Sequence, residues 1–383
     1  MYADRIKELK TLQTPCYVYD KQLLTRTLDA INAETAAHPN YHMHYAIKAN
    51  ANPDVLRQIA RAGLGADCVS GGEIRAALDA GFAPKSIAFA GVGKADWEIE
   101  LALQAGIGMF NVESVEELAV INELATLFNT RARVSFRINP DVGAHTHDNI
   151  TTGRAEDKFG IAKEQMVAVI RSTAAMPNID FQGLHFHIGS QLLVMDDFEA
   201  LCLRVNELQE ELDEAGIYAP NINVGGGLGV DYEQPDEHPV PDFHAYINTF
   251  TKLLQLRDGQ QLHFELGRAV VAQMGFLLTR VLYVKHATEK QFVIVDAGMT
   301  ELIRPALYNA FHKIDNLSAT GRSNTVTYDV VGPICESSDT FVKDYAMPET
   351  RRGDLLAIRS AGAYGETMAS TYNCRPLPPA HLI

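Results

Sequence analysis

The sequence predicts an α/β fold: an N-terminal (β/α)8 barrel of the TIM type, followed by a mostly antiparallel β-sandwich or β-barrel domain. Two observations predict it. Up to about residue 268, short apolar runs alternate with amphipathic helical patterns, and eight such runs occur. Beyond that residue, β-branched runs with alternating polarity follow one another with turns between them and few long helical patterns.

The expected barrel strands are the short apolar runs, at 42–46, 65–69, 86–90, 108–111, 133–138, 180–187, 221–224 and 261–265. Helical patterns separate them, at 53–62, 72–80, 95–105, 115–127, 163–174, 198–215 and 241–256. Strands that alternate with helices pair in parallel, and an eight-fold repeat closes a barrel. An open doubly wound sheet has the same local pattern. The absence of GxGxxG after the first strand weakens its dinucleotide-binding version.

Three segments are expected along the chain. Residues 1–25 hold an extended piece and the start of a helix, and this segment can join the β domain. Residues 26–270 form the barrel. Residues 271–383 form the β domain, with strands expected at 275–285, 291–295, 325–331 and 355–358.

Composition excludes several classes of protein. Of the 383 residues, 46% are hydrophobic and 21% charged, as in ordinary soluble globular proteins. A net charge of -15 argues against nucleic acid or an anionic membrane as partner, because both need clustered Lys and Arg. The N-terminus is too polar for a signal peptide, and no apolar run approaches a membrane span. The five scattered cysteines lack CxxC spacing, so we expect reduced thiols, a cytoplasmic protein and no metal site.

The first candidate for chemistry is Lys48, at the end of the strand-like stretch 43–50. Catalytic side chains of barrels lie at the carboxyl ends of strands. A lysine amine that is desolvated there can form a Schiff base with an aldehyde. The alternative is a strand-ending lysine that extends into water.

Other candidates follow later strands. His187 can stack on an aromatic ring, and Ser190 can donate to a phosphate. The glycine-rich stretch 223–229 can close its backbone N–H groups on a phosphate, or it can be only a tight turn. Glu265, three residues before Arg268, can face a pyridinium nitrogen, or the two can form a buried ion pair.

In the β domain, Cys335 stands beside Glu336, and Tyr364 offers a phenol. Cys335 can equally be a buried core thiol. Each of these signals is weak alone. A lysine, a phosphate loop, an acid–arginine pair and a thiol in one chain together predict a pyridoxal phosphate site.

These motifs resemble those of the fold-type III pyridoxal phosphate decarboxylases. The matching runs are YAIKAN at 45–50, HIGSQ at 187–191, GGG at 225–227, ELGR at 265–268, CES at 335–337 and AGAY at 361–364. The resemblance covers essentially the whole chain. It is strongest to the members that act on meso-diaminopimelate, at the last step of bacterial lysine synthesis. One departure is Leu266, where the family usually has proline.

The resemblance implies a role for each residue. Lys48 would hold pyridoxal 5'-phosphate as a Schiff base, His187 would stack on the ring with Asp67 nearby, and Glu265 would pair with the ring nitrogen. The residues implied to hold the phosphate or otherwise contact the cofactor are Ser190, Gly226, Gly227, Gly267, Arg268 and Tyr364. The residues implied to contact substrate are Arg268, Arg304, Tyr308, Glu336 and Tyr364.

The implied reaction is decarboxylation of meso-2,6-diaminopimelate to L-lysine and CO2. Cys335 is implied as the acid that returns a proton, with Lys48 as the alternative. Cys335 and Glu336 would reach the site from a second subunit, which implies a homodimer. Rival hypotheses are a related decarboxylase for carboxynorspermidine, ornithine or arginine, a remote alanine-racemase-like protein, and a non-catalytic cofactor carrier or regulatory homologue. Arg304 and Tyr308 favour a dicarboxylic substrate.

Overall fold

The computed structural model describes residues 5–142 and 158–383, and its contacts divide the chain into two compact units. The barrel unit comprises residues 27–229 and 242–267. The β unit comprises residues 1–26, 230–241 and 268–383. Residues 230–241 therefore group with the β unit, although they lie between two barrel strands in sequence. The limits 1–25, 26–270 and 271–383 for separately folding domains stay a prediction.

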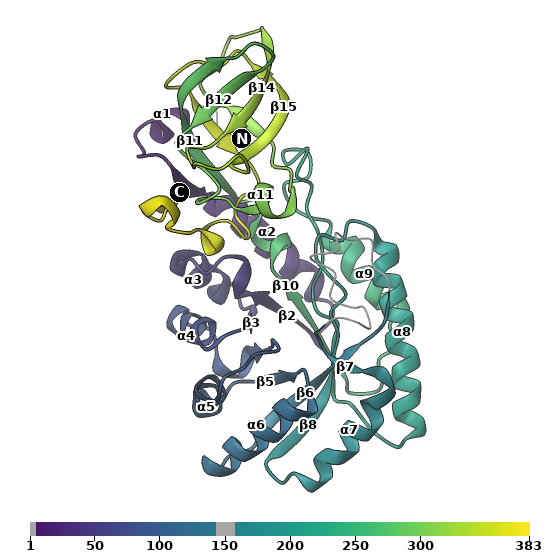
Figure 1. The fold of residues 1–383 in the computed structure, drawn as a ribbon. Helices are drawn as coiled ribbons and strands as arrows, with labels where there is room; N and C mark the ends of the chain where they lie inside the picture. The colour runs from purple at the N-terminus through teal and green to yellow at the C-terminus, as the bar shows by residue number, and fades with distance from the viewer. Residues whose placement is uncertain (1–4, 143–157) are drawn as a thin grey trace. The chain divides into compact units, whose positions relative to one another are not determined.

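The barrel unit contains eight parallel strands in a closed ring, which confirms the predicted barrel (Figure 1). They are β2 (Tyr41–Ala46), β3 (Gly65–Cys68), β4 (Ile87–Phe89), β5 (Met109–Val112), β6 (Ala132–Asn139), β8 (Ile179–His185), β9 (Asn221–Asn223) and β10 (Gln261–Leu266). Each strand pairs with the next of this series, and β10 pairs with β2 to close the ring. The two-residue β7 (Ile161–Ala162) extends β6.

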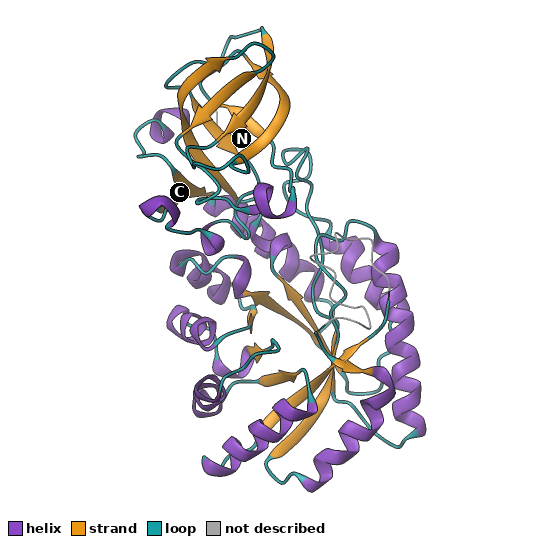
Figure 2. Cartoon of the chain, in the orientation of Figure 1, coloured by secondary structure: helices purple, strands orange, loops and turns teal. Residues whose placement is uncertain are grey.

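Helices cover the outside of these strands (Figure 2). They are α2 (Lys21–Thr35), which starts in the β unit, then α3 (Pro53–Arg61), α4 (Gly71–Ala80), α5 (Asp96–Ala105), α6 (Val115–Leu127), α7 (Met166–Ser172), α8 (Met195–Glu214) and α9 (Phe243–Leu253). The sequence marks their ends. Ser70 and Ser114 accept hydrogen bonds from the backbone at the starts of α4 and α6, and Gly81 ends α4 at φ +94°.

Aromatic packing fixes the last two helices against the ring of strands. Phe198 of α8 meets Tyr246 of α9 edge to face, with ring centroids 4.9 Å apart. Phe250 of α9 meets Phe264 of β10 in the same way at 5.2 Å. All four rings are fully buried. Each such aromatic pair contributes about 0.5–1.5 kcal/mol to stability beyond the contribution of its buried area. These contacts therefore fix the position of β10, the strand that carries Glu265.

The β unit is a mostly antiparallel sheet, as predicted. Its elements are α1 (Ile6–Leu9), β1 (Cys16–Tyr19), α10 (Arg268–Val271), β11 (Gly275–His286), β12 (Gln291–Val295), α11 (Arg304–Tyr308), β13 (Ile314–Asn316), β14 (Thr325–Val331), β15 (Thr340–Pro348), β16 (Leu355–Ile358) and β17 (Ala380–Leu382). Strand β1 pairs antiparallel with β11, so the N-terminal segment completes this sheet. Among the described strands of this unit, only β1 with β17 and β12 with β14 pair in parallel.

Two expectations differ from the structure at the level of elements. The pattern at 163–174 yields only the short α7, with 3₁₀ turns at 163–165 and 173–175. The first barrel strand ends at Ala46, and Lys48 lies in the following 3₁₀ turn rather than on the strand. Within the described residues, no helix is both long and apolar enough to cross a membrane.

Candidate active site

Lys48 and Asp67 lie at the carboxyl ends of neighbouring barrel strands. Lys48 Nζ is 3.5 Å from Asp67 Oδ2; the lysine side chain is 42% exposed and the aspartate 2%. Burial and the charge of Glu265 raise the pKa of Asp67 to about 6, while Lys48 opposes the rise. Asp67 Oδ1 is buried and makes no hydrogen bond to any described residue. A buried acceptor without a donor is costly, so this oxygen marks a place where a ligand group fits.

Glu265 is hydrogen-bonded to three side chains inside the barrel unit. Its Oε1 accepts from Asn111 Nδ2 at 3.1 Å and Asn223 Nδ2 at 2.7 Å, and its Oε2 lies 2.9 Å from His185 Nε2. Burial by itself disfavours the charged carboxylate, but His185 and Lys48 outweigh it and hold the pKa of Glu265 below its usual value. Glu265 is therefore ionised at neutral pH. A carboxylate in this state can keep a pyridine nitrogen protonated.

His187 follows β8 and contacts the glycine-rich loop after β9. The backbone N–H of Gly226 donates to His187 Nδ1 at 3.3 Å, which requires that nitrogen to carry no proton. Burial, with Arg137 and Lys48 nearby, lowers the pKa of His187 well below its usual value. His187 is thus a neutral, flat ring, as expected for stacking rather than for proton donation.

The two loops that follow β8 and β9 are joined by backbone hydrogen bonds. Leu192 N–H donates to Gly227 O at 2.9 Å, and Gly229 N–H donates to Leu192 O at 2.9 Å. A Cβ on Gly226 would lie 1.9 Å from Glu265 O, so no side chain fits there. Ser190 is half-buried in the first of these loops, and Gly267 directly follows β10.

A second cluster, in the β unit, gathers arginine and tyrosine. Tyr232 Oη accepts from Arg268 Nη1 at 2.6 Å and from Arg304 Nη1 at 2.9 Å. Arg268 also stacks on the Tyr364 ring, at 4.9 Å from its centroid. Burial would raise the pKa of the Tyr232 hydroxyl, but the two guanidinium groups hold that pKa below its usual value. The arrangement presents two cations on one phenolic oxygen, which suits the recognition of anionic groups.

Arg304 is oriented by a neutral histidine. His312 Nδ1 lies 2.8 Å from Arg359 O, a carbonyl that can only accept, so Nδ1 carries the proton. His312 Nε2 then accepts from Arg304 Nη1 at 2.9 Å. Burial first, and Arg304 second, lower the pKa of His312 to about 3. Among the described residues, Arg304 has no carboxylate partner, so its charge is available to a ligand.

The remaining predicted residues of the β unit are more open. Tyr308 ends α11 and is half-buried. Cys335 and Glu336 are exposed, with Asn373 Nδ2 3.3 Å from Cys335 Sγ. The alternative that Cys335 is a buried core thiol is therefore wrong for the single chain. All five cysteines are free.

Several residues around these clusters were missed from the sequence. Asn111, Asn223 and His185 surround Glu265, and Tyr232 joins Arg268 to Arg304. Asparagine at the end of a barrel strand was an available signal for the first two. The sequence gives no such signal for Tyr232, because this residue lies in a loop with no motif around it.

Comparison with known proteins agrees with this geometry. Residues 24–272 match the family described as pyridoxal-dependent decarboxylase, pyridoxal binding domain. The chain belongs to the pyridoxal-dependent decarboxylases. A diaminopimelate decarboxylase of Bacteroides thetaiotaomicron is 61% identical over 376 residues, covering 98% of this chain and 97% of that protein.

Solved decarboxylase structures share the fold. A Helicobacter pylori diaminopimelate decarboxylase complexed with L-lysine superposes with a TM-score of 0.91 at 40% identity, covering 98% of this chain and 93% of that one. A lysine/ornithine decarboxylase of Vibrio vulnificus reaches 0.82 at 21% identity, covering 100% of this chain and 98% of that one. At that identity the likeness shows the fold alone.

The barrel unit of this decarboxylase fits pyridoxal phosphate, the cofactor of the family. It offers a primary amine, an unpartnered buried carboxylate oxygen on Asp67, a flat neutral imidazole and an ionised Glu265. The Gly226 backbone lies where no Cβ fits, as a close approach to a phosphate requires. The family's usual proline is replaced by Leu266, the buried last residue of β10, which pairs in register with Tyr45.

Proposed function

We propose that this chain catalyses the pyridoxal phosphate-dependent decarboxylation of meso-2,6-diaminopimelate to L-lysine and CO2. The observation that carries the proposal is Arg304, a buried arginine oriented by Tyr232 and His312 with no carboxylate partner among the described residues. A substrate with a second carboxylate can supply that partner. The 61% identity to a diaminopimelate decarboxylase supports the same substrate.

The proposed roles follow the chemistry of each group. The bound cofactor withdraws electrons from the substrate α-carbon, which allows CO2 to leave. Lys48 binds the cofactor covalently through Nζ, and Asp67 lies beside it. Glu265 would keep a proton at the pyridine nitrogen, and His187 would stack on the ring. Ser190, Gly226, Gly227, Gly267, Arg268 and Tyr364 are proposed to hold the cofactor and its phosphate.

The substrate is proposed to contact Arg268, Arg304, Tyr308, Glu336 and Tyr364. Arg304 binds the carboxylate that is retained, so the other carboxylate is the one that leaves. Cys335 Sγ is the proposed donor of the proton that replaces CO2 on the α-carbon, with Lys48 Nζ as the alternative. We further propose a cytoplasmic homodimer in which Cys335 and Glu336 serve the partner's site, and the domain limits near residues 26 and 270.

Release of CO2 from a panel of amino acids tests the substrate. The purified, cofactor-loaded protein is expected to act on meso-diaminopimelate and to leave ornithine, arginine and carboxynorspermidine essentially untouched. A preference for ornithine would contradict the role of Arg304. No CO2 from any member of the panel, despite bound cofactor, would favour a non-catalytic carrier.

The cofactor attachment is tested separately. Lys48→Ala is expected to abolish the long-wavelength absorbance band of lysine-bound pyridoxal phosphate, because no other lysine is expected to replace it. Lys252→Ala removes an exposed lysine of α9 in the same unit and should leave the band unchanged. Borohydride reduction followed by peptide mapping should label Lys48, and a label on any other lysine would show the assignment to be wrong.

A further inference from the structure

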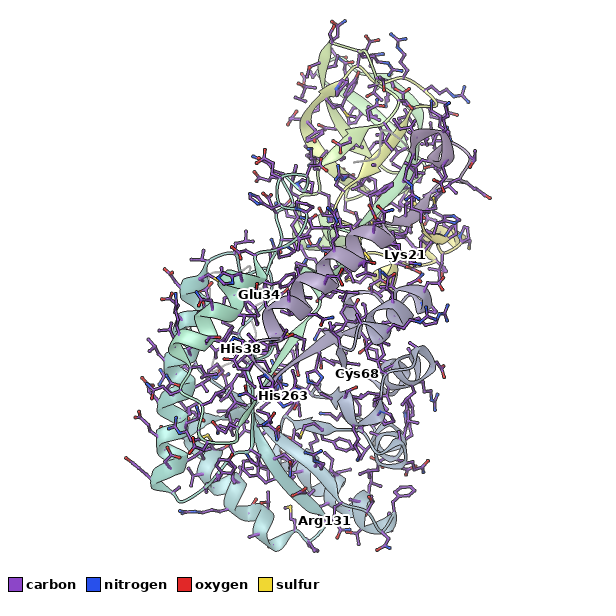
Figure 3. All side chains as sticks on the ribbon, turned by 180° about the vertical axis from the view of Figure 1, so that it is seen from behind. Lys21, Glu34, His38, Cys68, Arg131 and His263 are labelled. Atoms are coloured by element: carbon purple, nitrogen blue, oxygen red, sulfur yellow. The ribbon has the colours of Figure 1, made fainter. Side chains whose placement is uncertain are left out.

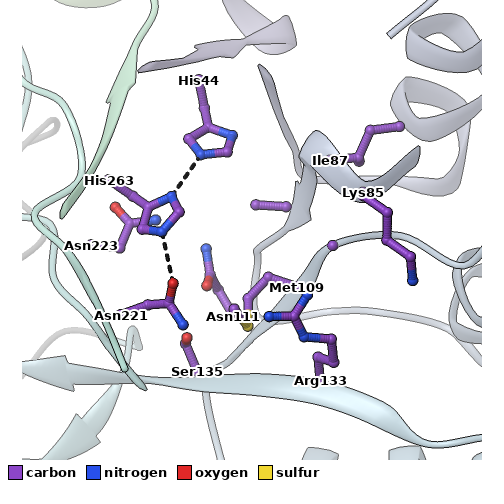
Figure 4. A pocket seen from close by; sticks show the side chains of 12 residues that line it. His44, Lys85, Ile87, Met109, Asn111, Arg133, Ser135, Asn221, Asn223 and His263 are labelled. Carbon is purple, nitrogen blue, oxygen red and sulfur yellow. Dashed lines mark hydrogen bonds between the residues drawn. The ribbon is translucent and has the colours of Figure 1, made fainter. Parts of the chain in front are cut away.

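A cavity in the barrel unit is lined by polar side chains from several of its strands, among them His44, Asn111, Ser135 and His263 (Figure 4). It has ≈ 80 Å³ of room for the centres of water molecules, several times the roughly 10–15 Å³ that one water needs. Barrel interiors are ordinarily filled with branched apolar side chains. The proposed function uses none of the cations, hydroxyl or histidines that line this cavity, so they call for another explanation.

The wall of the cavity is positively charged. Arg133 of β6 and Lys85 line it, and no carboxylate does. Arg133 donates to the neutral Gln182 Oε1 at 2.8 Å, and neither cation has a carboxylate partner among the described residues. Its neighbour along the strand, Arg137, does have one, in Glu113 at 2.9 Å. Arg133 is half-buried at this wall, whereas Lys85 is exposed to solvent. A half-buried cation without a carboxylate partner, in a chain of net charge -15, favours an anion as occupant.

Two further polar groups on the wall lack partners. Ser135 is 2% exposed, and its hydroxyl makes no hydrogen bond to any described residue. Asn111 is fully buried, and its Oδ1 is without a donor while its amide N–H group is used by Glu265. The serine can donate to an oxyanion. The asparagine oxygen needs a hydrogen from the ligand, so an anion that carries a proton satisfies both groups.

A pair of histidines borders the same cavity and is short of one proton. His44 Nδ1 lies 3.2 Å from Ser86 O, His44 Nε2 lies 3.0 Å from His263 Nδ1, and His263 Nε2 lies 2.9 Å from Asn221 Oδ1. The orientation of Asn221 is fixed, because its Nδ2 donates to Gln182 O at 2.8 Å. Both ends of this row are acceptors, so three hydrogen bonds require three protons. Two neutral rings supply two, and the pair is complete only as a cation.

The residues around the two histidines fix the geometry of the pair. A Cβ on Gly65 would lie 2.4 Å from His44 Nδ1 and 2.5 Å from Ser86 O, so only glycine leaves room for that hydrogen bond. His42 stacks on His263 at 4.8 Å, and the charged groups that act on the pair are His42, Glu265 and Arg133. Burial lowers the pKa of His44 and lowers that of His263 further. The third proton therefore needs a nearby negative charge.

We propose that this cavity binds one small oxyanion that carries a proton, of the class of hydrogenphosphate and hydrogencarbonate, and that the His44–His263 pair takes up a proton with it. Arg133 binds the charge, and Ser135 donates to one oxygen. The hydrogen of the anion satisfies Asn111 Oδ1. Sulfate and chloride carry no hydrogen and leave that oxygen without a donor.

Calorimetric titration of the cofactor-loaded protein at pH 7 tests the site, since the loaded protein already holds one phosphate group at its cofactor site. Inorganic phosphate and bicarbonate are titrated separately at matched ionic strength, which shows which of the two sources the site prefers. We expect one equivalent of at least one of them to bind, with sulfate about tenfold weaker. Equal binding of sulfate would contradict the requirement for a proton on the anion.

Substitutions locate the binding. Arg133→Gln should weaken binding about 10- to 100-fold, the usual scale for a lost charge-assisted hydrogen bond, and Ser135→Ala should weaken it less. The matched control is Arg131→Gln, which replaces an exposed arginine two residues before Arg133 (Figure 3). Arg131 pairs with Asp180 at 3.9 Å. The control variant should bind as the wild type does. Unchanged affinity in both Arg133→Gln and Ser135→Ala would place any bound anion elsewhere and overturn the proposal.

Proton uptake tests the histidine pair. The heat of binding should depend on the ionisation enthalpy of the buffer in the wild type and lose that dependence in His263→Gln. Circular dichroism and the thermal midpoint serve to verify folding of each variant, and Ser135→Ala remains informative if Arg133→Gln folds poorly. Heats that are independent of buffer in the wild type would overturn the coupling to His44 and His263.

Discussion

At the scale of single residues, environment rather than residue type sets the chemistry of this protein. Glu265 and Asp67 are both buried carboxylates of the barrel unit. His185 and Lys48 hold Glu265 ionised, whereas burial beside the charge of Glu265 raises the pKa of Asp67 to about 6. One carboxylate is thus committed to a permanent charge. The other is poised to gain or lose a proton near neutral pH.

Arg304→Ala is predicted to raise KM for diaminopimelate, because the retained carboxylate loses its charged partner. The binding free energy that is lost is about 2–4 kcal/mol, which lowers kcat/KM by roughly 30- to 900-fold. Steady-state kinetics of CO2 release measure it. Arg352→Ala, which removes an exposed arginine of the same unit, should leave KM unchanged. An unaltered KM in Arg304→Ala would exclude this arginine from substrate binding.

His312→Gln is predicted to make the protein less sensitive to acid. The pKa of His312 is near 6.5 when unfolded and about 3 when folded, so below pH 6.5 the unfolded chain binds a proton that the folded chain does not. The free energy of unfolding therefore falls as pH drops, by about 3 kcal/mol from this group between pH 6.5 and 4. Urea unfolding midpoints at pH 6.5 and pH 4 measure this change in the free energy of unfolding.

The comparison uses a surface histidine as its control. His238→Gln replaces an exposed histidine of the same unit and should lose as much stability in acid as the wild type. Glutamine at 312 can still accept from Arg304, so the folded structure is preserved at neutral pH. Equal acid sensitivity of His312→Gln and wild type would mean that His312 is protonated in the folded protein.

At the scale of elements, the loops after β8, β9 and β10 behave as one structure. Backbone hydrogen bonds join residues 192 and 227, and the Gly226 backbone touches the last residues of β10. The loop that is proposed to hold the phosphate is therefore positioned by the same strand that carries Glu265. Short connections between rigid strands provide this precision, because few backbone torsions remain free.

Gly226→Ala is predicted to weaken cofactor binding by at least about fivefold. Its Cβ would overlap Glu265 O at 1.9 Å, and relieving an overlap of this kind typically costs about 1–3 kcal/mol or more. Equilibrium dialysis against pyridoxal phosphate measures the affinity without relying on turnover. Gly93→Ala is the control, because a Cβ there meets no atom within 4 Å. Equal affinities for the two variants would show that the loop tolerates a side chain.

At the scale of the whole molecule, the proposed homodimer makes a prediction about mixed subunits. Lys48→Ala and Cys335→Ala are each expected to be inactive. If the sites are shared, random exchange gives about half mixed dimers with one intact site of two, so roughly a quarter of wild-type activity should return. Activity after mixing, with subunit exchange verified by two affinity tags, measures it. No recovery despite verified exchange would contradict shared sites.

Much of the fold could be predicted because it depends on local patterns. Runs such as Tyr41–Ala46 and Gln261–Leu266 have the length of strands, and helical patterns separate such runs along the chain. The boundary of α7 was less predictable, since its pattern is helical over more residues than form the helix. The placement of Lys48 past its strand was also not predictable, because a 3₁₀ turn has no distinct period.

The sequence by itself determined the class of fold, the order of its elements and the candidates for cofactor chemistry, because strand periodicity and short motifs are local properties. Tertiary structure alone decided which side chains share a hydrogen bond: His185 with Glu265, Tyr232 with two arginines, and His44 with His263. Those pairs lie 36 to 219 residues apart along the chain. A contact across such a distance depends on the register in which strands pair, and no local pattern in this sequence encodes which residues the register brings together.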